Sequence, residues 1–548
     1  MKRLNRIFAG LVLLLNCFYS FNLIAQAQVS KYNAHGWQML DYRDDSVFGA
    51  GITKAYDELL KGKTPKLVLV AVIDTGLDTA HEDLSGRIWT NTKEIPGNGI
   101  DDDHNGYIDD VHGWNFLGGR DGRNIIIEST ESYREIYRLR QINRSYPYRK
   151  NSVDNTYLEK VKAYFFRDSM VEVQNVSMLA HVIPQMHTAD SLLKIILHKD
   201  SVYAGDVMDF QTTDSSFRVV KKNTLMYFRK YGITPDMSLG KFIKEAEIYL
   251  QSSRFKLEDF SKNPDALRKE IVGDEFNNIN DRHYGNNNVA AGNPAHGTHV
   301  AGIIAASRGN GIGMDGIAEH VLIMPIRAVP DGDERDKDVA LAIRYAVDNG
   351  AQIINMSFGK YFSPEKNWVD EAVKYAEDHD VLIIHYAGND LSNLDTILHY
   401  PNALYEKSKE RSAAFITVGA SSGGPDSLIL ARFSNYGHME VDLFAPGVKV
   451  FSTVPSNQYA SYSGTSMAAP VVSGVAALLL GYYPGLSARQ LKATLLQTAM
   501  KLPDPQVKWP VNGKRADFNQ LSVSGGIVNA YNALLLASTL KGERKTGN

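Results

Sequence analysis

Three side chains that together can activate a hydroxyl for acyl transfer stand far apart in this chain of 548 residues. Asp74 follows an apolar run, His296 opens the stretch HGTHVAG, and Ser466 lies in GTSMAAP. A serine hydroxyl is a weak nucleophile until an imidazole accepts its proton and a carboxylate holds that imidazole in the right tautomer. The chain order Asp, His, Ser is one of those in which such triads occur. The sequence therefore predicts a hydrolytic triad.

Ser466 also admits a plainer interpretation. An apolar run, residues 467–480, follows it, and a serine before a helix commonly caps the helix N-terminus. The triad uses the same position, because a helix dipole stabilises negative charge that develops beside the serine. Gly464 is expected to permit a sharp turn and close approach of a substrate. Because Asp74 and His296 accompany Ser466, we favour the nucleophile. His299, one helical turn after His296, is expected to be a packed structural residue.

The segments VAVIDTGLD (70–78), HGTHVAG (296–302) and GTSMAAP (464–470) closely resemble the subtilisin family of serine peptidases. The resemblance covers about residues 54–118 and 281–535. It implies that Ser466 is the nucleophile, His296 the general base and acid, and Asp74 the residue that orients His296. Subtilisin itself has this chain order. The implied reaction is hydrolysis of peptide bonds through an acyl-enzyme on Ser466.

Asn389, in Ala387-Gly388-Asn389, matches the family's oxyanion-hole segment. Acyl transfer develops an oxyanion, and a side-chain amide aimed at this charge stabilises it. The backbone N–H of Ser466 would be the second donor. The alternative is an asparagine that only forms a turn at the end of a strand. We predict that Asn389 is catalytic.

The segment Asn355-Met356-Ser357-Phe358-Gly359 resembles the part of the family that pairs with extended substrate and forms one wall of the main specificity pocket. Substrate backbone would add beside it as an extra strand. Ser357, Phe358 and Gly359 are therefore predicted to bind substrate. Phe358 stands where relatives often carry leucine, and Lys360 where a small residue is common, so the preference of the pocket stays open.

The acidic stretch DDDHNGYIDD at 101–110 has the spacing of a calcium loop. Oxygen ligands at positions 1, 3, 5 and 9, a glycine at 6 and a carbonyl at 7 fit the first part of an EF-hand loop. Position 12 is His112 and not the usual glutamate, so Asp110 or a carboxylate such as Glu94 would complete the shell. The alternative is a solvated acidic turn. The predicted calcium ligands are Asp101, Asp103, Asn105, Tyr107 through its carbonyl, Asp109 and Asp110.

Short apolar runs alternate with helical patterns over most of the chain. The runs are residues 66–73, 321–329, 352–355, 381–384 and 415–418, and the helical patterns between them include 339–349 and 487–499, the latter with a capping box of Ser487 and Gln490. Continuous rather than alternating hydrophobicity suits strands that are covered on both faces, hence a mostly parallel sheet. The prediction is an α/β fold, a subtilisin-like three-layer architecture with active groups at the carboxyl ends of the strands.

Residues 120–280 break this alternation, being rich in charged and aromatic residues with mainly helical patterns at 131–142, 157–170 and 240–250. We predict a mainly helical insertion. Because 222 positions separate Asp74 from His296, both ends of the insertion flank catalytic elements. It is expected either to fold onto the main domain without taking part in chemistry or to shape access to the substrate cleft. The expected division is a signal peptide (1–27), an N-terminal segment (28–65), a peptidase domain (66–119 and 281–535), the insertion and a C-terminal tail (536–548).

The first 27 residues have the features of a secretory signal: Lys2, Arg3 and Arg6, an apolar stretch at 7–15, and Ala25-Gln26-Ala27 before a cleavage point. We therefore expect export through a cleaved signal peptide, to the periplasm or the outside. Lipid attachment at Cys17 is the less favoured alternative, because Asn16 before it is not small. Cys17 is the only cysteine, so the mature chain would hold no disulfide.

A net charge of −3 and the lack of a basic run argue against nucleic acid as a partner. No segment after the signal is predicted to be apolar enough to cross a membrane, and the oligomeric state stays open. The sequence predicts a secreted, calcium-binding serine endopeptidase that acts on proteins or peptides. The alternatives are a protease dedicated to processing one partner and a catalytically silent peptide-binding protein, whose mark would be a lost triad residue.

Overall fold

The structure is a computed structural model that describes residues 35–145, 155–231, 235, 237–259, 262–424 and 426–544. The predicted signal peptide, with Cys17 and the cleavage point after Ala27, lies outside the described residues.

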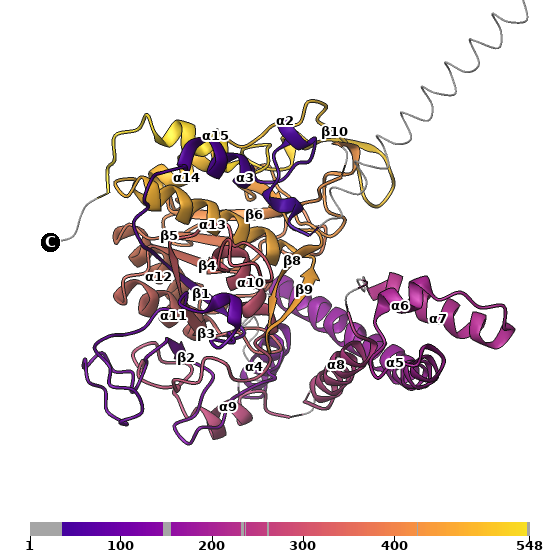
Figure 1. Cartoon of the computed structure of the whole chain (residues 1–548). Coiled ribbons are helices and arrows are strands. Elements are labelled where there is room, and N and C mark those ends of the chain that lie inside the picture. The colour runs from indigo at the N-terminus through magenta and orange to yellow at the C-terminus, as the bar shows by residue number, and fades with distance from the viewer. Residues whose placement is uncertain are drawn as a thin grey trace, which may run out of the picture.

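A seven-stranded parallel sheet forms the centre of the molecule (Figure 1), in the order β2-β3-β1-β4-β5-β6-β7. Every neighbouring pair of strands in it is parallel. The five apolar runs of the sequence all become strands, which confirms the α/β prediction. The strands are β1 (Val68–Asp74), β2 (Trp114–Asn115), β3 (Val321–Arg327), β4 (Ile353–Met356), β5 (Leu382–Tyr386), β6 (Phe415–Ser421) and β7 (Leu443–Pro446).

Helices cover both faces of the sheet, as continuous hydrophobicity requires. Along β1, Val70 and Val72 face a core that includes α10 (Ala295–Ala305) and α13 (Thr465–Tyr482). Ala71 and Ile73 face the opposite core, which includes α11 (Asp336–Asp348) and α12 (Lys366–Asp378). Strand alternation therefore divides one apolar run between two cores.

Helix α13 is the central helix of the first core. Its length and composition would suit a membrane span, so the expectation that no later segment is so apolar is wrong, but 94% of its apolar window is buried inside the protein. The helix begins at Thr465 with Gly464 as its N-cap residue and no side-chain cap. Ser466 therefore lies inside the first turn and does not cap the helix, which removes the plainer interpretation of this serine.

Described residues before β1 and after β7 pack into the first core of the sheet domain. The N-terminal part contains a short 3-10 helix (Trp37–Met39), α2 (Tyr42–Asp45), α3 (Ile52–Ala55) and a π-helical turn (Tyr56–Leu60), and a 3-10 turn (Glu82–Leu84) follows β1. The C-terminal part contains hairpin β8–β9 (Val450–Val454, Gln458–Tyr462), α14 (Ala488–Gln497), hairpin β10–β11 (Gln506–Lys508, Arg515–Asp517) and α15 (Ala530–Ala537), with 3-10 turns at Asp426–Leu428 and Phe518–Gln520. The predicted capping box of Ser487 and Gln490 opens α14.

The region between β2 and α10 is mainly helical, as predicted, and has two parts. Its helices are α4 (Glu131–Ser145), α5 (Asn155–Leu197), α6 (Ala204–Asp209), α7 (Ser215–Tyr231), α8 (Leu239–Asp259) and α9 (Ala266–Ile271). Helices α5 to α8 share an apolar cluster of their own and form an arm that projects from the sheet domain (Figure 1). Helix α4 and the start of α5 instead pack on Phe362 of the sheet domain.

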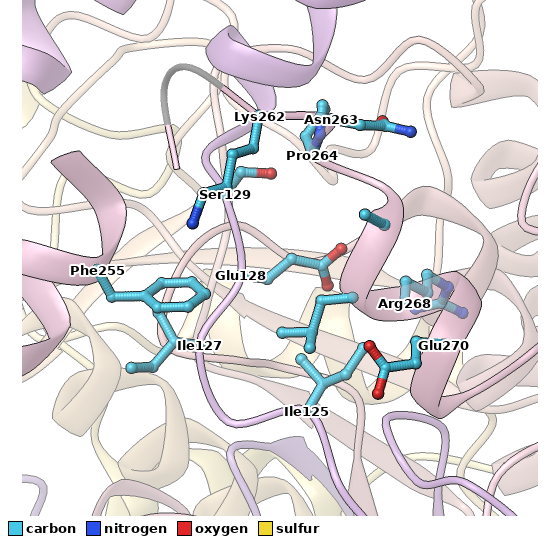
Figure 2. A pocket seen from close by; sticks show the side chains of 12 residues that line it. Ile125, Ile127, Glu128, Ser129, Phe255, Lys262, Asn263, Pro264, Arg268 and Glu270 are labelled. Carbon is cyan, nitrogen blue, oxygen red and sulfur yellow. The ribbon is translucent and has the colours of Figure 1, made fainter. Parts of the chain in front are cut away.

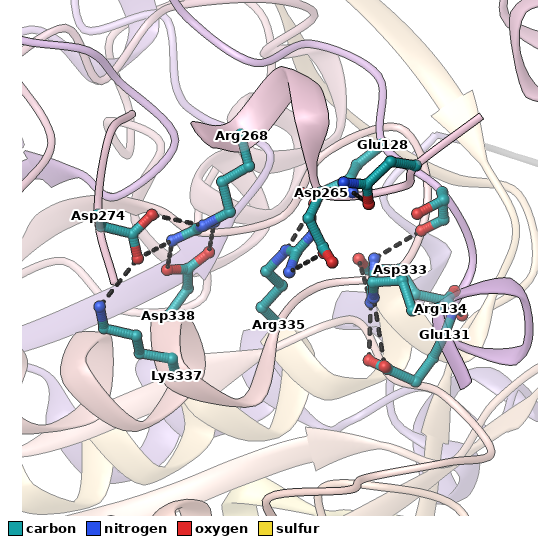
Figure 3. Close-up of polar contacts among 12 residues, drawn as sticks. Glu128, Glu131, Arg134, Asp265, Arg268, Asp274, Asp333, Arg335, Lys337 and Asp338 are labelled. Atoms are coloured by element: carbon teal, nitrogen blue, oxygen red, sulfur yellow. Dashed lines mark hydrogen bonds and ion pairs between the residues drawn. The ribbon is translucent and has the colours of Figure 1, made fainter. Parts of the chain in front are cut away.

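Buried ion pairs join the base of this region to α11 (Figure 3). Arg268 of α9 donates to both Asp274 and Asp338, and all three side chains are fully buried. Nearby, Arg335 contacts Glu128, and Arg134 of α4 contacts Glu131. These charges fix the base of the region against the helix that follows β3.

Candidate active site

The chain brings Asp74 and His296 into direct contact. Asp74 is the last residue of β1, and His296 lies in the first turn of α10. His296 Nδ1 lies 2.8 Å from Asp74 Oδ1, which also accepts the backbone N–H of Thr75 at 2.7 Å. Because a carboxylate only accepts, Nδ1 carries the proton and Nε2 is left as an acceptor. This is the tautomer that a general base needs.

The environment of His296 favours its charged form. Burial opposes the imidazolium, but the charge of Asp74 and its hydrogen bond outweigh burial and raise the pKa of His296 above the ordinary value of 6.5. His299 behaves in the opposite way, because burial lowers its pKa to about 3. His299 Nε2 lies 3.0 Å from the carbonyl of Ala460, and its ring stacks on Tyr462. His299 is thus the packed residue that the sequence predicted.

Ser466 lies almost buried at the N-terminus of α13, beside the segment predicted to pair with substrate. Its hydroxyl donates to the carbonyl of Ser357 at 3.2 Å. Among the described residues no hydrogen bond joins Ser466 to His296, so the hydroxyl must turn from the Ser357 carbonyl before His296 can accept its proton. Such loose contacts are common before substrate binds.

Two N–H donors converge in front of Gly464. Asn389 Oδ1 accepts the backbone N–H of Thr465 at 2.9 Å and its hydroxyl at 3.0 Å, which fixes the amide with Nδ2 on the other side. A Cβ atom placed on Gly464 would lie 3.6 Å from both Asn389 Nδ2 and the Ser466 backbone nitrogen. The φ of Gly464 is 167°, extended backbone that any residue adopts, so the expected sharp turn is wrong. This glycine instead keeps the space before the two donors open.

The predicted substrate-binding residues follow β4 directly. Ser357 donates its hydroxyl to the carbonyl of Ser466 at 2.9 Å, which ties this segment to α13. The side chain of Phe358 is buried in the core between the sheet, α11 and α12, so it supports the wall from behind. Gly359 has no space for a side chain, because a Cβ atom there would lie 2.5 Å from the carbonyl oxygen of Tyr400.

Lys360 points away from the cleft, which its sequence did not reveal. Its buried ammonium group lies 2.6 Å from Glu131 of α4 and 2.9 Å from Asp336 of α11. Burial lowers the pKa of Lys360, but these carboxylates raise it by more than burial lowers it. The net pKa therefore lies above the ordinary value, and the group stays charged. The side chain that was expected to alter the pocket thus anchors α4. No local signal could have shown this, since Glu131 stands 229 positions earlier.

The acidic loop brings only part of its predicted ligand set together. Carboxylate oxygens of Glu94, Asp101 and Asp103 lie within 4.8 Å of one another. Asn105 lies beside them, with its backbone N–H donating to Asp101 at 3.0 Å and to Asp103 at 3.2 Å. Glu94, which the spacing argument named only as a possible supplement, is therefore one of the three carboxylates of this group.

The remaining members of the predicted set have other contacts. Asp109 accepts backbone N–H groups of Gly97 at 2.8 Å, of residue 98 at 3.2 Å and of Gly99 at 2.9 Å. Asp110 accepts from residue 91 at 2.8 Å and from Tyr345 at 2.6 Å, and burial raises its pKa to about 6. The ring of Tyr107 packs edge-on against Tyr345. These side chains hold the loop onto the domain.

Several cavities lie at the junction with the helical region, and two of them bear on the site. One of about 290 Å³, with Ile127, Glu128 and Phe255 among its lining residues, sits at the base of this region and includes no triad residue (Figure 2). The other, about 600 Å³, opens between α8 and the sheet domain. Its lining includes Ala295, next to His296, and Tyr462, two residues before Gly464. The arm therefore borders residues that stand next to the predicted triad in the sequence.

Comparison with known proteins relates the sequence to one family. The model of the Subtilase family matches residues 66–520. A thermophilic serine proteinase of Bacillus sp. (strain AK1) is 37% identical over 240 residues, 44% of this chain and 52% of its own length. Thermitase of Thermoactinomyces vulgaris is 34% identical over 275 residues, 50% of this chain and 84% of its own. The match thus spans about half of the first relative and most of the second.

Subtilisin DY of Bacillus licheniformis is 38% identical over 212 residues, 38% of this chain and 72% of its own. A solved mutant of the protease domain of PatA is 30% identical, with a TM-score of 0.35, 45% of this chain and 81% of that chain covered.

Proposed function

Because the chain belongs to the subtilase family, we propose that it is a serine endopeptidase that hydrolyses peptide bonds through an acyl-enzyme on Ser466. The observation that carries this proposal is the 2.8 Å hydrogen bond between Asp74 and His296, two residues that stand 222 positions apart in the sequence. This bond holds His296 in the tautomer that a general base needs. The catalytic assignments of Ser466 and Asn389 belong to the same proposal.

In the proposed reaction these groups act in sequence. His296 Nε2 accepts the hydroxyl proton of Ser466 as the oxygen attacks the scissile carbonyl carbon. The carbonyl oxygen gains the electron pair and is stabilised by Asn389 Nδ2 and the Ser466 backbone N–H. His296 then gives the proton to the leaving amine, and the C–N bond breaks. Water, deprotonated by His296, attacks the ester, and the proton returns to Ser466 as the peptide acid leaves.

The test of this proposal is covalent labelling. A fluorophosphonate should modify the folded wild-type protein, and peptide mass mapping should place the adduct on Ser466, because only an activated serine attacks this reagent quickly. Prior heat denaturation should abolish the labelling. A folded protein that is not labelled would overturn the enzyme proposal and favour a peptide-binding role.

Replacing Asn389 with alanine is expected to lower kcat by about 10²–10³ with little change in KM, the size known for the corresponding asparagine of subtilisin. The reason is that Nδ2 stabilises charge present only in the transition state. Thr465→Val removes one of the two contacts that orient this amide and should give a smaller loss. Peptide hydrolysis measures both variants, and equal losses in kcat and in substrate binding would argue against an oxyanion role for Asn389.

The raised pKa of His296 predicts the acid limit of activity. Since only neutral His296 accepts the proton, kcat/KM should fall as the pH drops through a pKa above the ordinary 6.5. In Asp74→Asn the carboxylate that raises the pKa of His296 is gone, and burial alone lowers this pKa. The acid limb in the pH profile of the residual activity should therefore move to lower pH. A pH profile of peptide hydrolysis checks this. His379→Gln, a change at an exposed histidine, should leave the limb where it is.

The acidic loop supports a structural calcium site in the same proposal. Calcium prefers hard oxygen ligands, and Glu94, Asp101 and Asp103 supply three carboxylates within 4.8 Å of one another. Asn105 is close enough to join them. The donor set therefore fits calcium, and these residues would hold the ion and fix the loop between the sheet and α11. We assign it a role in stability and none in the chemistry.

Removing calcium is expected to lower the melting temperature of the wild type. At a free concentration one hundred times the Kd, binding to the folded state alone stabilises it by about 2.7 kcal/mol. Asp103→Asn should melt lower in calcium and respond less to a chelator, whereas Asp378→Asn, at an exposed helix position, should respond like the wild type. A wild-type melting temperature that calcium and chelator leave unchanged would contradict the site.

Export belongs to this proposal as well. The basic residues before position 7, the apolar stretch and the small residues at 25 and 27 support a cleaved signal peptide. N-terminal sequencing of protein recovered from outside the cytoplasm should begin at Gln28. A protein that keeps residues 1–27, or that carries lipid on Cys17, would contradict cleavage at this point.

A further inference from the structure

Three rings fill the space between the substrate-pairing segment and the strand end that carries Asn389. A Cβ atom on Gly359 would lie 2.6 Å from His399 Cε1 and 3.0 Å from Tyr386 Cε1. A Cβ atom on Gly388, the neighbour of Asn389, would lie 3.5 Å from His399 Nε2. The ring of His399 thus reaches from one side of this space to the other. The ring of Tyr361 stands edge-on to it, with centroids 5.1 Å apart.

The space that these rings fill is the one that a bound peptide needs. In the proposed complex, the scissile carbonyl lies before Asn389 Nδ2 and the Ser466 backbone N–H, and the preceding chain extends along Ser357 to Gly359. The side chain of the residue that contributes this carbonyl, called P1, therefore projects between the two segments. Its size is limited by what His399, Tyr386 and Tyr361 leave free.

Two hydrogen bonds tie the opposite sides of this space together. The hydroxyl of Tyr361, two residues beyond Gly359, donates to Asp390, which follows Asn389. The hydroxyl of Tyr386 donates to the carbonyl of Gly359 at 3.3 Å. Behind them, the cavity bordered by Tyr386, His399 and Pro401 measures only about 10 Å³. That volume is about the space of one water and accepts no large side chain.

The long helix α5 holds the outer ring from the solvent side. The guanidinium of Arg167 lies 4.9 Å from the centre of the Tyr361 ring and 4.4 Å from that of Tyr164. Tyr164 also packs directly on Tyr361, with centroids 4.9 Å apart. Arg167 further pairs with Asp168 at 3.0 Å, which orients it. A ring that could otherwise swing outward is therefore stacked against the helical region.

We propose that Tyr361, Tyr386 and His399 close the specificity pocket to large side chains, so that the peptidase cleaves after glycine, alanine or serine. Helix α5 is the support that keeps Tyr361 in the closed position. This inference rests on the proposed function, since it concerns the pocket of the same site. It also gives the helical region a defined part in substrate selection, through Arg167 and Tyr164.

The test uses peptides that are identical except for alanine, leucine or phenylalanine at P1. Wild-type kcat/KM should favour alanine over phenylalanine by at least about 10²-fold, since even one misfit methylene changes it by about 10–200-fold. Tyr386→Ala and His399→Gly should shift this ratio toward phenylalanine by at least about tenfold. Tyr375→Ala, the same truncation on the outer helix α12, should keep the wild-type ratio. Arg167→Ala should shift it in the direction of Tyr386→Ala, but less.

Two outcomes overturn the inference separately from the proposed function. Wild-type cleavage of the phenylalanine peptide as fast as the alanine peptide, or an unchanged ratio in Tyr386→Ala, would show that the rings do not limit P1. Cleavage sites in a denatured protein provide a second readout on the wild type alone, and frequent cleavage after leucine, phenylalanine or tyrosine would have the same meaning. Absence of all cleavage together with an unlabelled Ser466 would overturn the proposed function and the inference with it.

Discussion

Replacing Ser466 with alanine is expected to lower kcat about a million-fold, the size known for the corresponding serine of subtilisin. Without the hydroxyl no acyl-enzyme forms, so the remaining groups can only polarise the carbonyl and position water. The Asn389 amide and the Ser466→Ala backbone N–H stay in place, because Thr465 and not Ser466 orients the amide. The variant should therefore still accelerate peptide hydrolysis about 10³–10⁴-fold over the uncatalysed reaction.

The matched control is Ser463→Ala, three residues earlier. The Ser463 hydroxyl accepts the backbone N–H of Lys449 at 2.8 Å and has no part in the proposed reaction. This variant should keep kcat and KM near the wild-type values. Equal melting temperatures for the two variants would separate chemistry from folding. Peptide hydrolysis by a folded Ser466→Ala protein at more than a few per cent of the wild-type rate would move the nucleophile elsewhere.

The sheet and the position of Asp74 at the carboxyl end of one of its strands could be predicted because their signals are local. A strand covered on both faces must be apolar at nearly every position, so 66–73 could be identified from its own residues, and Asp74 could be placed at its end. The strand order could not be derived in this way. Strand β1 lies between β3 and β4, which come more than 240 residues later, and only tertiary packing decides such an order.

The substrate wall shows why the rest of the site escaped prediction. From the sequence, Lys360 and Phe358 stood as unusual residues in a pocket, yet both side chains turn away from it. The rings that do fill the space come from three separate segments, and Tyr361 owes its position to Asp390 and Arg167. The direction of a charged or aromatic side chain cannot be predicted when its partner comes from a distant part of the sequence. The same holds for Asp109, whose backbone partners precede it by a loop of ten residues or more.

Arg268→Ala is expected to be the most destabilising single change at the base of the helical region, by about 3–5 kcal/mol of unfolding free energy. Arg268 is fully buried and donates two hydrogen bonds to each of two carboxylates (Figure 3). Those to Asp274 measure 2.8 and 2.9 Å, and both of those to Asp338 measure 2.7 Å. Removing it leaves two buried carboxylates facing each other, with Lys337 as a remaining cation beside Asp274 at 2.8 Å. Chemical denaturation measures the loss.

The control for this prediction lies at the same junction. Arg123 pairs with Asp121 at 2.8 Å and with Glu270 of α9 at 2.6 Å, but these side chains are about half exposed. Solvent screens such pairs, so Arg123→Ala should cost no more than about 1 kcal/mol. A triple change of Arg268, Asp274 and Asp338 to apolar residues of similar volume should cost less than Arg268→Ala alone, since no charge is then left buried. Equal losses for Arg268→Ala and Arg123→Ala would contradict this account, because burial is what distinguishes the two arginines.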